Sequence, residues 1–151
     1  MKVLIISFAL ILFGGWPGST SNMNQEKNND SVENQVSTGI QFQKMTLAEA
    51  KAESAKSGKL IFIDAYTTWC GPCKLLERNT FSNAEVGTKF NSKFINLRVE
   101  MESDKDAPEL YQTYSITAYP TMLFLDSNGK LVKRVLGYRD APTLLKDVAE
   151  L

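Results

Sequence analysis

The chain has 151 residues, of which 43% are hydrophobic and 23% are charged. This composition is typical of a single globular domain rather than two. Basic and acidic residues balance at 17 each, so there is no positive excess to bind nucleic-acid phosphates. The chain contains no histidine, which excludes Ser-His-Asp triads, Cys-His pairs and histidine-ligated metals. We therefore expect neither nucleic acid nor metal as a ligand.

The N-terminus has the pattern of an export signal. Lys2 precedes an apolar run of eleven residues, 3–13, that is broken only by Ser7. Such a run fits a signal peptide and is shorter than the roughly 20 residues of a membrane-spanning helix. We predict a signal peptide over residues 1–20, with a buried helix or an uncleaved anchor as the alternative. The protein is then exported, to the periplasm if the organism is Gram-negative and otherwise to the extracellular space.

Residues 21–38 are mainly small or polar, with isolated apolar residues at Met23, Val32 and Val36. A segment of this composition buries too little surface to offset its ordering entropy, so a disordered linker is expected. One globular domain should then occupy residues 39–151.

Strand and helix patterns alternate through that domain. Strands are expected at 40–42, Leu60–Tyr66, 94–101, Thr121–Leu125 and 130–136. Helices are expected at 47–57 behind a Thr46–Glu49 capping box, at 71–79, behind a second capping box at Ser82–Glu85, around Pro108 to Tyr114, and after Asp140. The order β-α-β-α-β-α-β-β-α predicts an α/β fold with a central mixed sheet flanked by helices.

The two cysteines, Cys70 and Cys73, carry the strongest chemical signal. They follow an apolar strand and begin a helix, where backbone dipoles and unpaired N–H groups stabilise a thiolate. Cys70 should lie at the exposed tip and Cys73 one turn further in. Half a zinc site is excluded because no further thiol or imidazole exists. An inert structural disulfide is the other alternative, but so small a loop adds little stability.

The segment Trp69-Cys70-Gly71-Pro72-Cys73-Lys74 is identical to the active-site motif of thioredoxins, and the element order resembles their fold. The resemblance covers roughly residues 40–151. The longer pattern, with Glu77, Thr80-Phe81 and Val86, is more similar to exported bacterial thioredoxin-like domains, such as the reductase domain of a membrane thiol-electron transporter. The resemblance implies a buried acid at Asp64, a cis-proline segment at Tyr119-Pro120-Thr121, and a groove glycine at Gly137. Where many thioredoxins place a lysine near this acid, the chain offers Asn96.

Each accessory residue has an alternative role. A buried Asp64 would exchange a proton with Cys73, but Asp64 can also end its strand facing solvent. Pro120 can simply begin a strand. A cis bond there would instead bring the backbone of Tyr119 and Thr121 beside the thiols, where it can pair with an extended substrate. Trp69 is expected to form an apolar wall for the substrate, with plain core packing as the alternative.

The resemblance implies an exported thiol-disulfide oxidoreductase that reduces protein disulfides through Cys70 and Cys73. We assign Asp64 to catalysis and expect substrate binding at Trp69, Gly71, Pro72, Tyr119, Pro120, Thr121 and Gly137. No cofactor is expected, the protein should be a monomer, and a membrane thiol-electron donor should re-reduce it. One alternative is an oxidant or isomerase of secreted proteins, against which the Gly71-Pro72 dipeptide argues. A client-binding module without turnover is the other.

Overall fold

The computed structural model describes residues 38–151. The expected signal peptide and all but the last residue of the expected linker lie outside this part of the chain. The elements in chain order are α1 (Leu47–Ser57), β1 (Leu60–Tyr66), α2 (Gly71–Leu76), η1 (Glu77–Phe81), α3 (Ala84–Lys93), β2 (Phe94–Glu100), α4 (Ala107–Tyr114), β3 (Thr121–Leu125), β4 (Leu131–Leu136) and α5 (Ala141–Asp147). None of the helices in residues 38–151 has the length and apolarity needed to cross a bilayer.

The four strands form one mixed sheet in the order β2-β1-β3-β4. β1 runs parallel to β2 and antiparallel to β3, and β4 is antiparallel to β3. In this register Asp64 pairs with Arg98 on β2, and Ala65 pairs with Thr121 on β3. The predicted α/β fold with a mixed sheet is confirmed.

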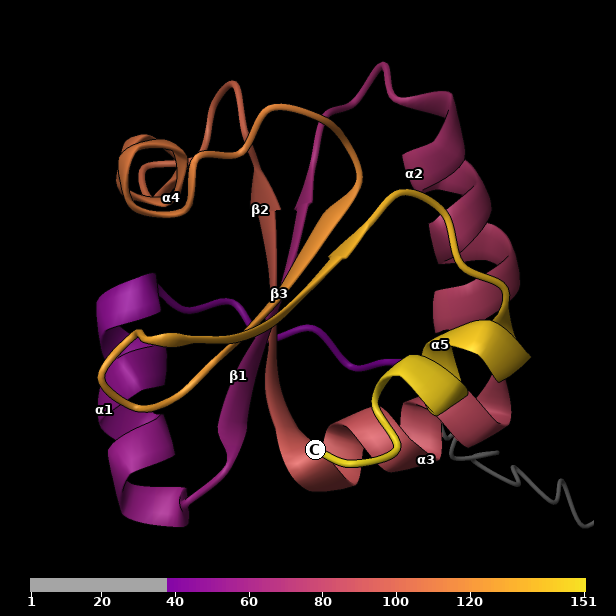
Figure 1. Cartoon of the computed structure of the whole chain (residues 1–151), viewed down its shortest axis with the longest axis horizontal. Coiled ribbons are helices and arrows are strands. Elements are labelled where there is room, and N and C mark those ends of the chain that lie inside the picture. Colours follow the sequence, from indigo (N-terminus) through magenta and orange to yellow (C-terminus); the bar gives the residue numbers. More distant parts are fainter. Residues whose placement is uncertain (1–37) are drawn as a thin grey trace, which may run out of the picture. The chain divides into compact units, whose positions relative to one another are not determined.

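Helices cover both faces of the sheet (Figure 1). α1 and α4 pack on one face, over a core that includes Leu47, Leu110 and Ile63. α2, η1, α3 and α5 pack on the other, around Phe62, Phe90 and further apolar side chains. β1 is therefore covered on both sides, which explains its nearly continuous apolar sequence.

Local side-chain hydrogen bonds define several helix ends as predicted. Thr46 and Glu49 form the reciprocal capping box at the start of α1, and Gly58 ends that helix with a positive φ of 73°. Asp140 accepts a hydrogen bond from the Thr143 N–H and caps α5.

The predicted strand at residues 40–42 is wrong. The backbone N–H of Ile40 donates to the carbonyl of Phe81, and that of Gln41 donates to the side chain of Asn91. These partners are a helix-end carbonyl and a side chain, and the single backbone bond to β2, from the Gln43 N–H to the Asn96 carbonyl, does not make a ladder. The segment instead packs Phe42 against the aromatic core.

The helical region after the cysteines also differs from the prediction. α2 continues into a π-helical turn, η1, so helical winding extends to Phe81 rather than ending near Asn79. The next helix is capped by Asn83, whose side chain accepts from the N–H groups of Glu85 and Val86. The predicted capping box at Ser82 is therefore wrong, because Ser82 instead donates its hydroxyl proton to the Arg78 carbonyl.

Candidate active site

Cys70 and Cys73 form a disulfide at the N-terminus of α2, with 5.3 Å between their Cα atoms. Cys70 is the N-cap residue, and its Sγ accepts a 3.2 Å hydrogen bond from the Cys73 N–H. The sequence and the fold therefore place the pair where a helix-end N–H group points at a sulfur atom.

The expected exposure of Cys70 is wrong for this disulfide form. Cys70 is only 4% exposed and Cys73 only 1%, whereas Gly71 and Pro72 between them are exposed. The Cys70 side chain turns back toward the first helical turn to bond with Cys73. The Gly71-Pro72 dipeptide, which carries no charge, is thus the surface that the disulfide loop presents.

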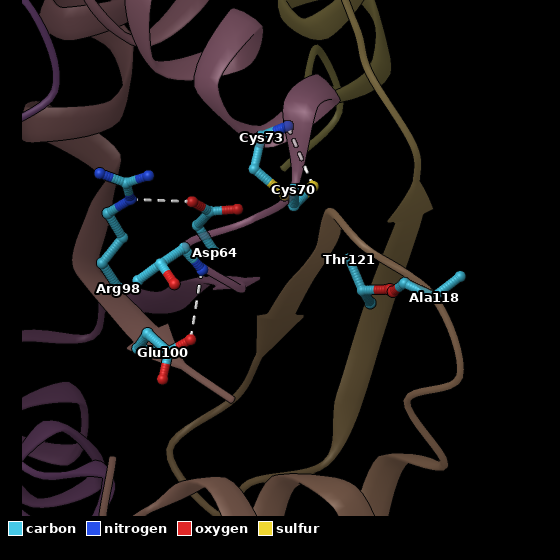
Figure 2. Close-up of a disulfide and its surroundings, with 8 residues drawn as sticks. Asp64, Cys70, Cys73, Arg98, Glu100, Ala118 and Thr121 are labelled. Atoms are coloured by element: carbon cyan, nitrogen blue, oxygen red, sulfur yellow. Dashed lines mark hydrogen bonds and ion pairs between the residues drawn. A yellow bond between two sulfur atoms is a disulfide. The ribbon is translucent and has the colours of Figure 1, made fainter. Parts of the chain in front are cut away.

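Asp64 is fully buried on β1, close to the end of the strand that leads to the cysteines. Burial raises the pKa of Asp64 to about 6, while the charge and hydrogen bond of Arg98 act in the opposite direction. Figure 2 shows the Asp64 carboxylate between Arg98 and the cysteine pair. Its Oδ2 accepts a 3.0 Å hydrogen bond from Arg98 Nε, and its Oδ1 has no partner within the described residues.

The residue beside this acid is Arg98, not Asn96. Asn96 lies two residues earlier on β2, opposite Phe62, and its side chain hydrogen-bonds to Gln41 and Asn91. The two side chains share one face of the strand. An alignment that is displaced by two residues therefore selects Asn96 in place of Arg98.

Two further groups hold the Arg98 guanidinium. Its Nη1 forms an ion pair of 2.9 Å with Glu77 Oε1, and its Cζ atom lies 4.2 Å from the ring centroid of Tyr66. Because Glu77 follows α2 directly, Arg98 connects the cysteine-bearing helix to the buried acid on β1.

The Tyr119-Pro120 peptide bond is cis, as the sequence resemblance implies. The hydroxyl of Thr121 donates to the Ala118 carbonyl at 2.7 Å, and Figure 2 shows this pair on the opposite side of the cysteines from Arg98. Gly137, with a φ of 80°, donates its N–H to the Pro120 carbonyl at 2.8 Å. These bonds fix the cis-proline loop at the start of β3.

Trp69 is 64% exposed, which excludes the core-packing alternative. Its ring meets Tyr119 edge-on, with 6.1 Å between the ring centroids. Its indole N–H donates to Glu102 Oε1 at 2.9 Å. The ring is therefore held at the surface by residues from two other loops.

The sequence-predicted residues thus gather at one end of the sheet. Trp69 contacts Tyr119, Gly137 bonds to Pro120, and Thr121 pairs with the neighbour of Asp64. Sequence reasoning missed three charged residues of this region, namely Arg98, Glu100 and Glu102, and it used Glu77 for the family resemblance without giving it a place in the site. Arg98 is marked by its charge between the apolar Leu97 and Val99 of β2, and Glu77 is marked by its spacing of four residues from Cys73. No local pattern marks Glu100 or Glu102.

Thiol-disulfide interchange is the chemistry that this CxxC pair supports, since it can pass between a dithiol and an intramolecular disulfide. In residues 38–151 no three His, Cys, Asp or Glu side chains gather in a way that would hold a metal ion.

Several similar proteins are named for thiol-disulfide chemistry. The thiol:disulfide interchange protein DsbD of Actinobacillus pleuropneumoniae is 30% identical over 154 aligned residues, which cover 99% of this chain but 26% of that protein. This chain therefore spans about a quarter of the length of that relative. Thioredoxin-1 of Drosophila melanogaster is 37% identical over 54% of this chain and 70% of its own length.

Among solved structures, a protein from Bacteroides thetaiotaomicron, provisionally named a disulphide-isomerase, is 44% identical. It aligns with a TM-score of 0.65 over 73% of this chain and 90% of its own. The family described as Thioredoxin-like matches residues 41–127, more than half of the sequence. The chain belongs to this Thioredoxin-like family.

Proposed function

We propose that the protein is an exported thiol-disulfide oxidoreductase that reduces disulfide bonds in protein substrates. The observation that carries this proposal is the cysteine pair at the N-terminus of α2, with the exposed and uncharged Gly71 and Pro72 between the two cysteines. The helix end favours a thiolate on Cys70, while the dipeptide adds no charged group that would strengthen the effect.

The reaction proceeds in two exchange steps. The Cys70 thiolate attacks one sulfur of the client disulfide, forms a mixed disulfide and releases the other client sulfur as a thiolate that takes up a proton. Cys73, once deprotonated, attacks the Cys70 sulfur, closes the intramolecular disulfide and releases the second client thiol. Two electrons have then passed from the protein to the client.

We assign Asp64 the role of accepting the Cys73 proton. A carboxyl group with a pKa of about 6 is largely ionised at neutral pH and can still exchange a proton. Arg98 occupies Oδ2, so the unpartnered Oδ1 is the atom available for this transfer, through water if the distance requires it.

The cycle requires a dithiol donor that re-reduces the Cys70–Cys73 disulfide. Similarity to the thiol:disulfide interchange protein DsbD supports thiol-disulfide exchange partners. As the donor we propose a membrane thiol-electron carrier, and as the location the space outside the cytoplasm. A signal peptide over residues 1–20 and a linker over 21–38 belong to the same proposal. We also propose that the protein is a monomer. Its substrate is proposed to bind in a groove formed by Trp69, Gly71, Pro72, Tyr119, Pro120, Thr121 and Gly137.

A second candidate is disulfide isomerisation, favoured by the provisional name of the 44% identical Bacteroides protein. An isomerase returns from the mixed disulfide to its dithiol after rearranging the client, without net electron transfer. A scrambled client therefore discriminates between the two, because only a reductase consumes one donor equivalent for each client disulfide opened.

Trapping of mixed disulfides tests the proposal in the full chain. Cys73→Ser should accumulate covalent adducts with insulin, since no second thiol resolves them, and Cys70→Ser should accumulate none. With dithiothreitol as donor, the unaltered protein should reduce many insulin equivalents. Equal trapping by both variants would contradict the assigned roles of the two cysteines. Reduction of only one insulin equivalent per protein molecule would favour a client-binding module.

A further inference from the structure

Glu102 holds the exposed Trp69 beside the disulfide. It lies in the loop between β2 and α4, and its Oε1 accepts the 2.9 Å hydrogen bond from the indole N–H. Tyr119 meets the same ring edge-on. The orientation of the Trp69 ring thus depends on one carboxylate and one aromatic neighbour.

Glu100 fixes the loop that carries Glu102. Its Oε2 accepts hydrogen bonds from the Glu102 N–H at 3.1 Å and from the Ser103 hydroxyl at 2.7 Å. Its Oε1 accepts one from the N–H of Thr68, next to Trp69, at 3.3 Å. One carboxylate therefore ties the active-site loop to the β2–α4 loop, so that Glu102 is presented in a defined position.

Aromatic rings and uncompensated carboxylates come together at this surface. The pKa of Tyr119 is raised by burial first, and then by the nearby Tyr111, Glu102 and Glu100. Tyr111 itself is 51% exposed and lines a hollow of about 290 Å³ together with Glu102. Four ion pairs occur in residues 38–151, and none of them includes Glu100 or Glu102.

We propose that Glu102 is a specificity-determining residue that favours client segments with a lysine or arginine beside their disulfide. The inference rests on the proposed function, since it concerns which disulfides the cysteine pair reaches. The second oxygen of Glu102 accepts no hydrogen bond from the described residues and is free to pair with a client cation. The faces of Trp69 and Tyr111 add favourable cation–π contacts.

The size of the effect follows from the exposure of the site. Charge pairs at exposed positions are weak and are screened by salt, and a cation–π contact adds a similar amount. We therefore expect about a three-fold to ten-fold preference in kcat/KM for a basic client at low salt. Most of this difference should lie in KM, because the contact is made away from the sulfur atoms.

Two peptide disulfides that differ only in a lysine or a glutamate next to the cysteine provide the test. The full-length protein should prefer the lysine peptide, and the preference should decline as salt is raised. Glu102→Gln keeps an oxygen acceptor for Trp69 but loses the charge, so it should react with both peptides nearly equally. Glu53→Gln removes an exposed charge from α1 and should retain the preference.

A second measurement separates charge from positioning. The indole N–H resonance of Trp69, assigned with Trp69→Phe, should shift in Glu102→Ala and much less in Glu102→Gln. Equal use of both peptides by the unaltered protein, or an unchanged preference in Glu102→Gln, would overturn the proposal. Reduction of a small uncharged disulfide tests the proposed function itself. If the uncharged disulfide is reduced but the charge preference is absent, only the role of Glu102 is wrong. If the uncharged disulfide is not reduced either, the proposed function is wrong as well.

Discussion

The buried carboxyl group of Asp64 carries an energetic cost that depends on pH. Its pKa is about 6 in the folded protein, above the ordinary value of 3.8, because burial disfavours the charged form. The folded state therefore binds this proton more tightly than the unfolded state does. As pH rises from about 4 through 6, the stability that the protonated acid contributes is lost.

Asp64→Asn should remove this pH-dependent cost. Relative to the unaltered protein, the variant should gain about 2 to 3 kcal/mol of unfolding free energy between pH 4 and pH 8, as expected for a difference of roughly two pKa units. Urea unfolding of the oxidised forms at both pH values measures it. A stability difference between the two proteins that stays constant from pH 4 to pH 8 would contradict the burial argument.

Sequence predicted Asp64 as a buried acid but not Arg98 as its partner. The burial follows from the apolar neighbours of Asp64 within one strand. The pairing instead depends on the register between β1 and β2, which joins residues 34 positions apart. A two-residue offset between two strands leaves every side chain on the same face, so the alternating pattern cannot choose between Asn96 and Arg98 as the partner.

At the scale of elements, local patterns predicted several helix ends correctly but failed at α3, where Asn83 rather than Ser82 is the cap. The Thr46–Glu49 box, the Gly58 C-cap and the Asp140 cap each involve residues within a few positions, and all are present. The segment at 40–42 was mispredicted because its partners, Phe81 and Asn91, lie about 40 to 50 positions away. Its short alternating pattern carries no information about them.

The start of α3 gives a direct test of how helix ends are set. Asn83→Ala should lower the free energy of unfolding by about 1 kcal/mol, since the side chain satisfies two backbone N–H groups. Ser82→Ala is the matched control, because Ser82 does not cap α3, and it should cost clearly less. Thermal or urea unfolding compares the two, and a larger loss in Ser82→Ala would restore the capping box predicted from sequence.

At the scale of the whole molecule, the fold brings distant segments to one end of the sheet. The motif after β1, the cis-proline loop before β3 and Gly137 after β4 were each recognisable in the sequence. The β2–α4 loop was not, since its contribution arises only when Glu102 meets Trp69 across 33 residues. The sequence therefore predicted the cysteine pair and its chemistry, but it did not predict the charged residues that surround the pair.

The proposed function requires a reducing Cys70–Cys73 couple. In the part of the chain that the structure describes, the Cys73 N–H is the only hydrogen-bond donor to Cys70 Sγ, and Gly71 and Pro72 add no charge. Thiolate stabilisation by the helix end alone should leave the potential near that of thioredoxin, about −270 mV, and below about −220 mV. Equilibration of the full chain with glutathione buffers, followed by thiol alkylation and mass analysis, measures this potential directly. A value above about −180 mV, in the range of protein disulfide isomerase, would contradict the reductase account and favour an oxidant or isomerase.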